Sequence, residues 1–244
     1  LQTSGSTGKP KEIQMSKDKM ILSAKRTGKY LNLQAKEKTL CCLPLNYIAG
    51  KMMVVRALLI GLELDCIAPT SNLEDLQKDT TYDFVAMVPI QAENSFNKLT
   101  QFKKIIIGGA NVSDDLAKKL AKVNAEIFET YGMTETITHI AAKKIGAEYF
   151  NVLSHVTIDS DERNCLIISA PTISESKIIT NDIVAILSDK KFKWLGRFDN
   201  VINSGGIKLH PERIEEKLSK IIEQRFFVAG ISDTQLGEKL FLII

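Results

Sequence analysis

The sequence predicts an α/β protein with a mostly parallel sheet covered by helices, followed by a small antiparallel barrel-like region and the start of a small α+β C-terminal domain. Up to residue 136, strands apolar on both faces alternate with amphipathic helices, as in sheets that are covered on both sides. Over 137–197, short apolar runs between polar turns favour antiparallel strands. We expect a main domain over 1–197 and a truncated second domain over 198–244.

The first part contains the βα alternation. A helix is expected after Ser16, a good N-cap residue, with apolar side chains at helical spacing as far as Tyr30. Ligands of such sheets bind where strands end at their carboxyl side. The expected strands are Thr39–Pro44, Leu64–Ala68, Phe84–Pro89, Lys104–Gly108 and Ala125–Tyr131, and the further helices are Lys51–Ile60 and Ser113–Val123.

The later elements are shorter. A helix is expected over Pro211–Gln224, since proline suits a first turn, acidic residues come early and lysines come late. The strand Phe226–Ile231 follows it and opens the α+β domain. The antiparallel strands are expected at Ile137–Ala142, Asn151–Ile158, Leu166–Ala170, Ile178–Leu187 and Phe192–Leu195.

Composition is that of an ordinary globular protein of 244 residues, 44% hydrophobic and 25% charged. A net charge of +3 is too small to indicate nucleic acid or a membrane surface as partner. The longest apolar stretch, Met52–Leu62, is interrupted by Arg56 and is too short to span a bilayer. Four cysteines without a CxxC pair are expected to be free thiols, which indicates the cytoplasm. The sequence does not indicate the oligomeric state.

The run TSGSTGKPK, Thr3–Lys11, is suited to a polyphosphate. Its glycines allow backbone N–H groups to approach an anion, its hydroxyls add donors and its lysine adds charge. The spacing is not that of a Walker loop, and a solvated turn explains the same residues. The candidate phosphate ligands are Thr3, Ser4, Gly5, Ser6, Thr7, Gly8 and Lys9.

Two more motifs follow predicted strands at their carboxyl ends. GGA, at Gly108, Gly109 and Ala110, allows a flat group to approach the backbone, although a plain turn explains it too. YGMTET begins at Tyr131, whose ring offers a face to a purine, and its alternative is the start of a helix at Thr134. Within it, Gly132 and Met133 adjoin the site, Thr134 offers a hydroxyl to phosphate, and Glu135 suits Mg²⁺.

The third cluster is GRFDNVINSGGIKLHPERIE. Arg197 can bond ribose or phosphate oxygens, and Asp182, in IITNDIV upstream, can accept from a ribose diol. Asp199 lies in a polar turn, while Gly205 and Gly206 permit a hairpin or the passage of a thin ligand. A linker followed by a hairpin is the structural alternative for this segment.

These motifs, in this order and spacing, resemble the adenylate-forming superfamily of acyl-CoA synthetases, adenylation domains and luciferases from Thr3 to about Gly237. The resemblance implies an AMP-forming acid–thiol ligase that uses ATP, Mg²⁺ and coenzyme A on a small carboxylic acid. It implies catalytic roles for Lys9, Thr134 and Glu135. It implies that Gly108, Gly109, Ala110 and Tyr131 hold the adenine, and that Asp182 and Arg197 bind the ribose. It also implies that Asp199 is a hinge and that Gly205 and Gly206 border the path of the CoA arm.

Among members, Tyr149–Leu218 looks most like shortened o-succinylbenzoate–CoA ligases of menaquinone biosynthesis. The substrate would be a dianion with a benzene ring, so we expect apolar walls and a cation or donor pair. Two positions depart from the family's usual pattern: Asn181 replaces a glycine, and Tyr47, an acyl-pocket candidate, replaces a histidine.

The resemblance leaves further expectations open. The chain begins at Leu1 within the phosphate-like loop and ends at Ile244 before the family's late lysine segment, so adenylation by this length of chain is expected to be slow or absent. Another aryl- or acyl-CoA ligase, or an adenylation domain, would share every motif. A non-catalytic nucleotide-binding module is the second alternative.

Overall fold

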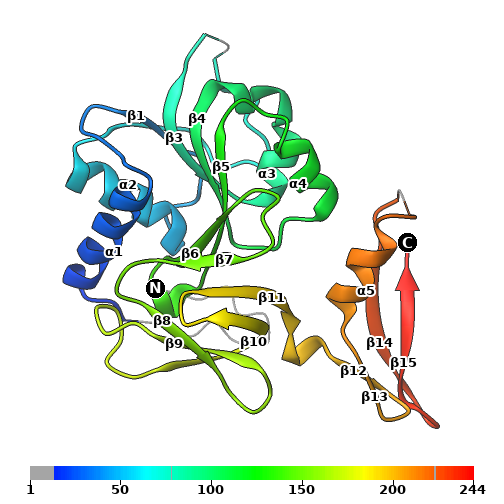
Figure 1. Cartoon of the computed structure of the whole chain (residues 1–244). Coiled ribbons are helices and arrows are strands. Elements are labelled where there is room, and N and C mark those ends of the chain that lie inside the picture. The colour runs from blue at the N-terminus through cyan, green and yellow to red at the C-terminus, as the bar shows by residue number, and fades with distance from the viewer. Residues whose placement is uncertain (1–13, 78, 223) are drawn as a thin grey trace.

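The computed structural model describes residues 14–77, 79–222 and 224–244, so the loop from Thr3 to Lys9 lies outside the described residues. Five strands with helices between them form the first part (Figure 1). They are β1 (Lys38–Cys41), β2 (Glu63–Cys66), β3 (Tyr82–Met87), β4 (Phe102–Ile107) and β5 (Glu126–Gly132). The helices are α1 (Lys17–Tyr30), α2 (Ile48–Ile60), α3 (Pro89–Asn94), the 3-10 helix η1 (Phe96–Gln101) and α4 (Asp114–Leu120).

These five strands are parallel to one another and are covered on both faces, as the sequence predicts. On one face, Val85, Ile105 and Ile127 pack with Leu116 and Leu120 of α4. On the other face, side chains of alternate parity, such as Phe84 and Ile106, pack with residues of α2. Figure 1 shows the helix pair α1 and α2 opposite α3 and α4. Successive strand residues therefore belong to different cores, which explains the unbroken apolar runs.

The antiparallel strands continue the same sheet. The strand β6 (His139–Lys144) pairs with β5, so one sheet of eleven strands has the order β2-β1-β3-β4-β5-β6-β7-β11-β10-β9-β8. Its third core joins Ile140, Phe150 and Phe192 with Ala24 of α1 and Met52 of α2. The other antiparallel strands are β7 (Phe150–Val152), β8 (Thr157–Ser160), β9 (Cys165–Ser169), β10 (Ile178–Ser188) and β11 (Lys191–Arg197).

A smaller unit follows β11 through the 3-10 helix η3 (Phe198–Asn200). Its helix α5 packs beside a four-stranded sheet with the order β13-β12-β15-β14, and Figure 1 shows this unit standing to one side of the main part. We refer to residues 201–244 as the C-terminal unit. Its elements are β12 (Ile202–Ser204), β13 (Ile207–Leu209), α5 (Pro211–Leu218), β14 (Phe227–Asp233) and β15 (Gly237–Ile243).

Two expected elements are wrong in extent. The strand expected over Asn151–Ile158 is divided into β7 and β8, because the chain turns at His155, which adopts a positive φ of 61°. The helix expected over Pro211–Gln224 ends at Leu218, after which the Ser219 hydroxyl donates to the Glu216 carbonyl and competes with the helical pattern. No helix in the described part of the chain is long and apolar enough to cross a bilayer.

Candidate nucleotide and acyl site

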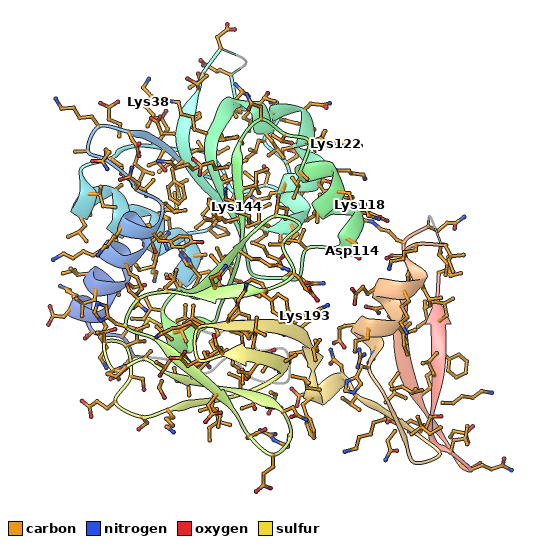
Figure 2. The ribbon with its side chains drawn as sticks, in the orientation of Figure 1. Lys38, Asp114, Lys118, Lys122, Lys144 and Lys193 are labelled. Carbon is orange, nitrogen blue, oxygen red and sulfur yellow. The ribbon has the colours of Figure 1, made fainter. Side chains whose placement is uncertain are left out.

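A cavity of about 1760 Å³ opens between the carboxyl ends of β3, β4 and β5 and the helix α5. Figure 2 shows the labelled side chains of Asp114 and Lys193, two of its lining residues, on the side of the main part that faces the C-terminal unit. The predicted site residues that line this cavity are Gly108, Gly109, Ala110, Tyr131, Gly132, Met133, Thr134, Glu135, Asp182 and Arg197. Segments from four separate parts of the chain therefore meet at one cavity.

The GGA turn follows β4 directly. Gly109 has a φ of +86°, a conformation that favours glycine, and its backbone is exposed at the cavity wall. Behind this turn, Glu129 of β5 accepts from the backbone N–H of Val112 and forms an ion pair with Lys143, with 3.1 Å between Lys143 Nζ and Glu129 Oε2. Burial raises the pKa of Glu129 despite the nearby Lys143 charge. This pair fixes the turn against β5 and β6.

The YGMTET segment leaves β5 and reverses into β6. Its 3-10 turn η2 (Thr134–Thr136) ends in a γ-turn centred on Ile137, which has a φ of 68° and ψ of −56° while the Thr138 N–H donates to the Thr136 carbonyl at 2.8 Å. Gly132 lies so close to the returning strand that a Cβ would meet the Thr138 carbonyl oxygen at 2.4 Å. Such a strained turn of a β-branched residue is held by its surroundings and exposes Glu135 at the cavity.

Asp182 is the centre of a polar network. The Tyr131 hydroxyl donates to Asp182 Oδ2 at 2.6 Å, and the indole N–H of Trp194 donates to Oδ1 at 3.2 Å. Arg197 Nη1 lies 3.7 Å from the same Oδ1. The pairing of β10 with β9 is irregular between Ile179 and Ile183, and such bulges redirect side chains.

Electrostatics keep these groups in defined states. Burial, together with the Asp182 charge and hydrogen bond, raises the pKa of Tyr131, so its hydroxyl stays protonated and donates. Partial burial lowers the pKa of Arg197, but the hydrogen bond to Asp199 and the Asp182 charge outweigh it and raise the pKa overall. The Tyr131 ring packs edge to face against Phe150 and Phe192, so its role as a face for the purine stays a prediction.

A buried basic cluster, Arg26, Arg56 and His139, lies on the α1 and α2 side of the cavity. Arg56 is 2% exposed and lines the cavity; its Nη1 contacts only the Met53 sulfur in the described residues, and its Nε has no hydrogen-bond partner there. Burial lowers the pKa of Arg56 to about 10. A buried cation without a carboxylate partner is costly, which indicates that an anion binds at this wall.

His139 lies near both arginines and is neutral. Burial, followed by the charges of Arg56 and Arg26, lowers the pKa of His139 to about 3. Its Nε2 lies 3.4 Å from the Thr27 hydroxyl. Apolar residues that line the same cavity include Leu43, Ile48, Ala49, Val88 and Ile137.

This histidine makes the stability of the protein depend on pH. Because the pKa of about 3 in the folded state lies below the ordinary 6.5, the unfolded chain takes up the proton first on acidification. The contribution of His139 to the free energy of unfolding is fully present above pH 6.5 and is lost as the pH falls towards 3. The loss is at most about 1.4 kcal/mol per pH unit. We expect His139→Gln to flatten that acid limb in urea titrations between pH 4 and 7. The exposed His155→Gln control should leave the slope unchanged, and equal slopes in both variants would contradict the assignment.

The remaining predicted residues lie elsewhere. Tyr47 is 50% exposed at the start of α2 and is not among the described residues that line the cavity, although Ile48 and Ala49 after it are. Gly205 and Gly206 form the hairpin turn between β12 and β13, with positive φ at both. Asp199 lies in η3, at the junction with the C-terminal unit. Their roles stay predictions.

Sequence reasoning missed two residues of the site. Trp194, the only tryptophan, falls in the strand expected over Phe192–Leu195, but its contact with Asp182 depends on the pairing of β10 with β11. Arg56 has a signal in the sequence, since it is a single charge within an otherwise apolar run.

Comparison with known proteins decides the family. The family described as AMP-binding enzyme matches residues 2–164, which is more than half of the chain. The chain belongs to the AMP-binding enzyme family. An acyl-CoA synthetase (AMP-forming)/AMP-acid ligase II-like protein from Dyadobacter fermentans is 37% identical, with a TM-score of 0.74 over 99% of this chain and 73% of its own.

Two further relatives of this AMP-binding chain are more distant. The 2-succinylbenzoate–CoA ligase of Haemophilus influenzae is 27% identical over 88% of this chain and 51% of its own length, so the chain spans about half of that relative. The O-succinylbenzoate coenzyme A synthetase of Bacillus subtilis in complex with ATP and magnesium ion has a TM-score of 0.84 at 19% identity, over 99% of this chain and 58% of that one. At that identity the likeness shows the fold, a large mixed sheet with a small C-terminal one.

Proposed function

We propose that the protein activates a carboxylic acid with ATP as an acyl-adenylate and transfers the acyl group to coenzyme A, and that the acid is o-succinylbenzoate. The observation that carries the proposal is Arg56, which has no carboxylate partner among the described residues and lines the same cavity as Asp182 and Arg197. One carboxylate of the acid would react at the nucleotide, while the second would pair with Arg56. A ring between them suits the apolar residues that line the cavity.

The chemistry needs positioned charge more than a side-chain nucleophile. The carboxylate oxygen of the acid attacks the α-phosphorus and pyrophosphate leaves; the thiol of coenzyme A then attacks the acyl carbon and AMP leaves. Asp182 would accept from the ribose hydroxyls and Arg197 would donate to nucleotide oxygens, which fixes the phosphate relative to the acid. Each donor aimed at the developing charge contributes roughly 3 kcal/mol to lowering such a barrier.

Glu135 would hold Mg²⁺, which would supply positive charge that offsets the phosphates. Glu135 fits this role because its carboxylate is exposed at the cavity and follows Thr134 in the tight turn η2. The main domain would extend to Arg197, with a hinge at Asp199 and a CoA path near Gly205 and Gly206. Lys9 and its loop would hold the phosphates.

The test is pyrophosphate exchange by the full-length protein over a panel of acids. We expect exchange with o-succinylbenzoate and much weaker exchange with benzoate or succinate, which lack the second carboxylate or the ring. Strong exchange with another acid and none with o-succinylbenzoate would indicate a different acid ligase. Binding of AMP without exchange for any acid would indicate a nucleotide-binding module.

Glu135→Ala should lower Mg²⁺-dependent turnover by about 10- to 100-fold, because the metal loses its protein carboxylate. Its exposure at the turn means that the unfolding midpoint should not move. Magnesium titrations of exchange rate measure the effect. Glu162→Ala, an exposed glutamate outside the cavity lining, is the matched control. Identical magnesium curves for both variants would remove Glu135 from the site.

A further inference from the structure

Arg197 contacts two carboxylates at once. Its Nη1 lies 3.7 Å from Asp182 in the proposed ribose site, and its Nη2 lies 2.6 Å from Asp199 Oδ2 in the turn that joins the C-terminal unit. The shorter distance and the hydrogen bond belong to Asp199. A nucleotide that needs the guanidinium must therefore compete with the junction for it.

The other oxygen of Asp199 is also held. The Asn181 side-chain amide donates to Asp199 Oδ1 at 2.9 Å, and its own oxygen accepts from Arg163 Nη1 at 3.1 Å. Arg163 in turn lies over the ring of Phe198, 5.1 Å from its centroid, and is fixed by Asp161.

A second carboxylate reaches the junction from α5. Glu212 Oε1 accepts from the Asn200 amide at 2.7 Å and from the backbone N–H of Arg197 at 3.4 Å. The approach is possible because Gly196 has no side chain; a Cβ there would meet Glu212 Oε2 at 2.5 Å. Glu212 therefore ties the first turn of α5 to the same short segment that Asn181 ties to β10.

We propose that Asn181, Asp199 and Glu212 form a latch that holds the C-terminal unit in the present orientation, and that a nucleotide engaging Arg197 opens it. Asn181 is a positioning residue, since it acts through Asp199. The inference rests on the proposed nucleotide site at Arg197. Part of the nucleotide's binding free energy is used to separate Arg197 from Asp199, so weakening the latch should tighten nucleotide binding.

Distances between two spin labels measure the orientation directly. Labels are attached to the exposed positions Lys118→Cys on α4 and Lys220→Cys after α5, in a Cys66→Ser background because Cys66 is the exposed cysteine. Asn181→Ala is compared with Asn151→Ala, an exposed asparagine on β7, each with and without AMP. Calorimetry gives the AMP dissociation constant of every variant. Glu212→Ala is a second latch variant, because it removes the acceptor of the Asn200 amide and of the Arg197 backbone N–H.

The latch predicts a narrow distance distribution in the unmodified protein, broadened by AMP. It predicts an equally broad distribution in Asn181→Ala and Glu212→Ala without AMP, and both variants should bind AMP at least about threefold more tightly. A narrow distribution in both variants, matching Asn151→Ala, would overturn the latch even if AMP binds. If the unmodified protein binds no AMP, the proposed nucleotide site fails, while the label distances without AMP still test the latch.

Discussion

Replacing Arg56 with methionine should remove the use of o-succinylbenzoate and, at the same time, stabilise the protein. The loss follows because the second carboxylate of the acid would then be buried without a cation, which costs about 10²- to 10³-fold in kcat/KM. The gain follows because the Arg56 cation has no carboxylate partner in the described part of the chain and its pKa is lowered by burial. Exchanging a poorly compensated buried charge for an apolar side chain of similar length raises the free energy of unfolding by about 1–4 kcal/mol.

The measurement is pyrophosphate exchange with o-succinylbenzoate and with benzoate, beside urea unfolding of the same samples. Arg26→Met is the matched control, because Arg26 is also buried, its Nη1 has no hydrogen-bond partner among the described residues, and it is not among the described residues that line the cavity. It should stabilise the fold without changing the preference between the two acids. An Arg56→Met protein that retains its preference for the dianion would place the second carboxylate elsewhere.

Asp182→Ala should weaken AMP binding by about 10²-fold, the loss of charge-assisted hydrogen bonds from a ribose diol. The substitution also removes the acceptor of the Tyr131 hydroxyl and of the Trp194 indole, so the free energy of unfolding should fall by about 1–3 kcal/mol. Calorimetry measures the affinity. The fluorescence of Trp194, the only tryptophan, reports the same site because its N–H contacts Asp182.

Tyr131→Phe separates the two effects. It removes one donor to Asp182 but leaves the carboxylate and the ring contacts with Phe150 and Phe192. We expect this variant to lose some AMP affinity, but its loss should be several-fold smaller than the loss in Asp182→Ala. Wild-type AMP affinity in a folded Asp182→Ala protein would show that the carboxylate does not bind the nucleotide.

The positions of the polar turns followed from local rules. GGA and YGMTET come after apolar strands, and parallel strands place their carboxyl ends at one edge of a sheet. It could therefore be predicted that Gly109 and Tyr131 lie at the same site, and both line the cavity. The helix start at Ser16, which accepts from the Lys19 N–H, was equally local. The end of α5 could not be predicted from such local rules. The Ser219 hydroxyl donates to the Glu216 carbonyl and competes with the helical pattern, and the periodicity of the sequence does not show this.

The amino-acid sequence by itself determined the α/β class, the motifs and the family, because strand and helix periods and short glycine turns are properties of neighbouring residues. Tertiary structure alone decided that the antiparallel strands extend the parallel sheet, that Trp194 contacts Asp182, and that Arg56 lines the cavity with no carboxylate partner among residues 14–77, 79–222 and 224–244. Strand pairing and burial bring together residues distant in the chain, and the cost of a charge depends on those neighbours.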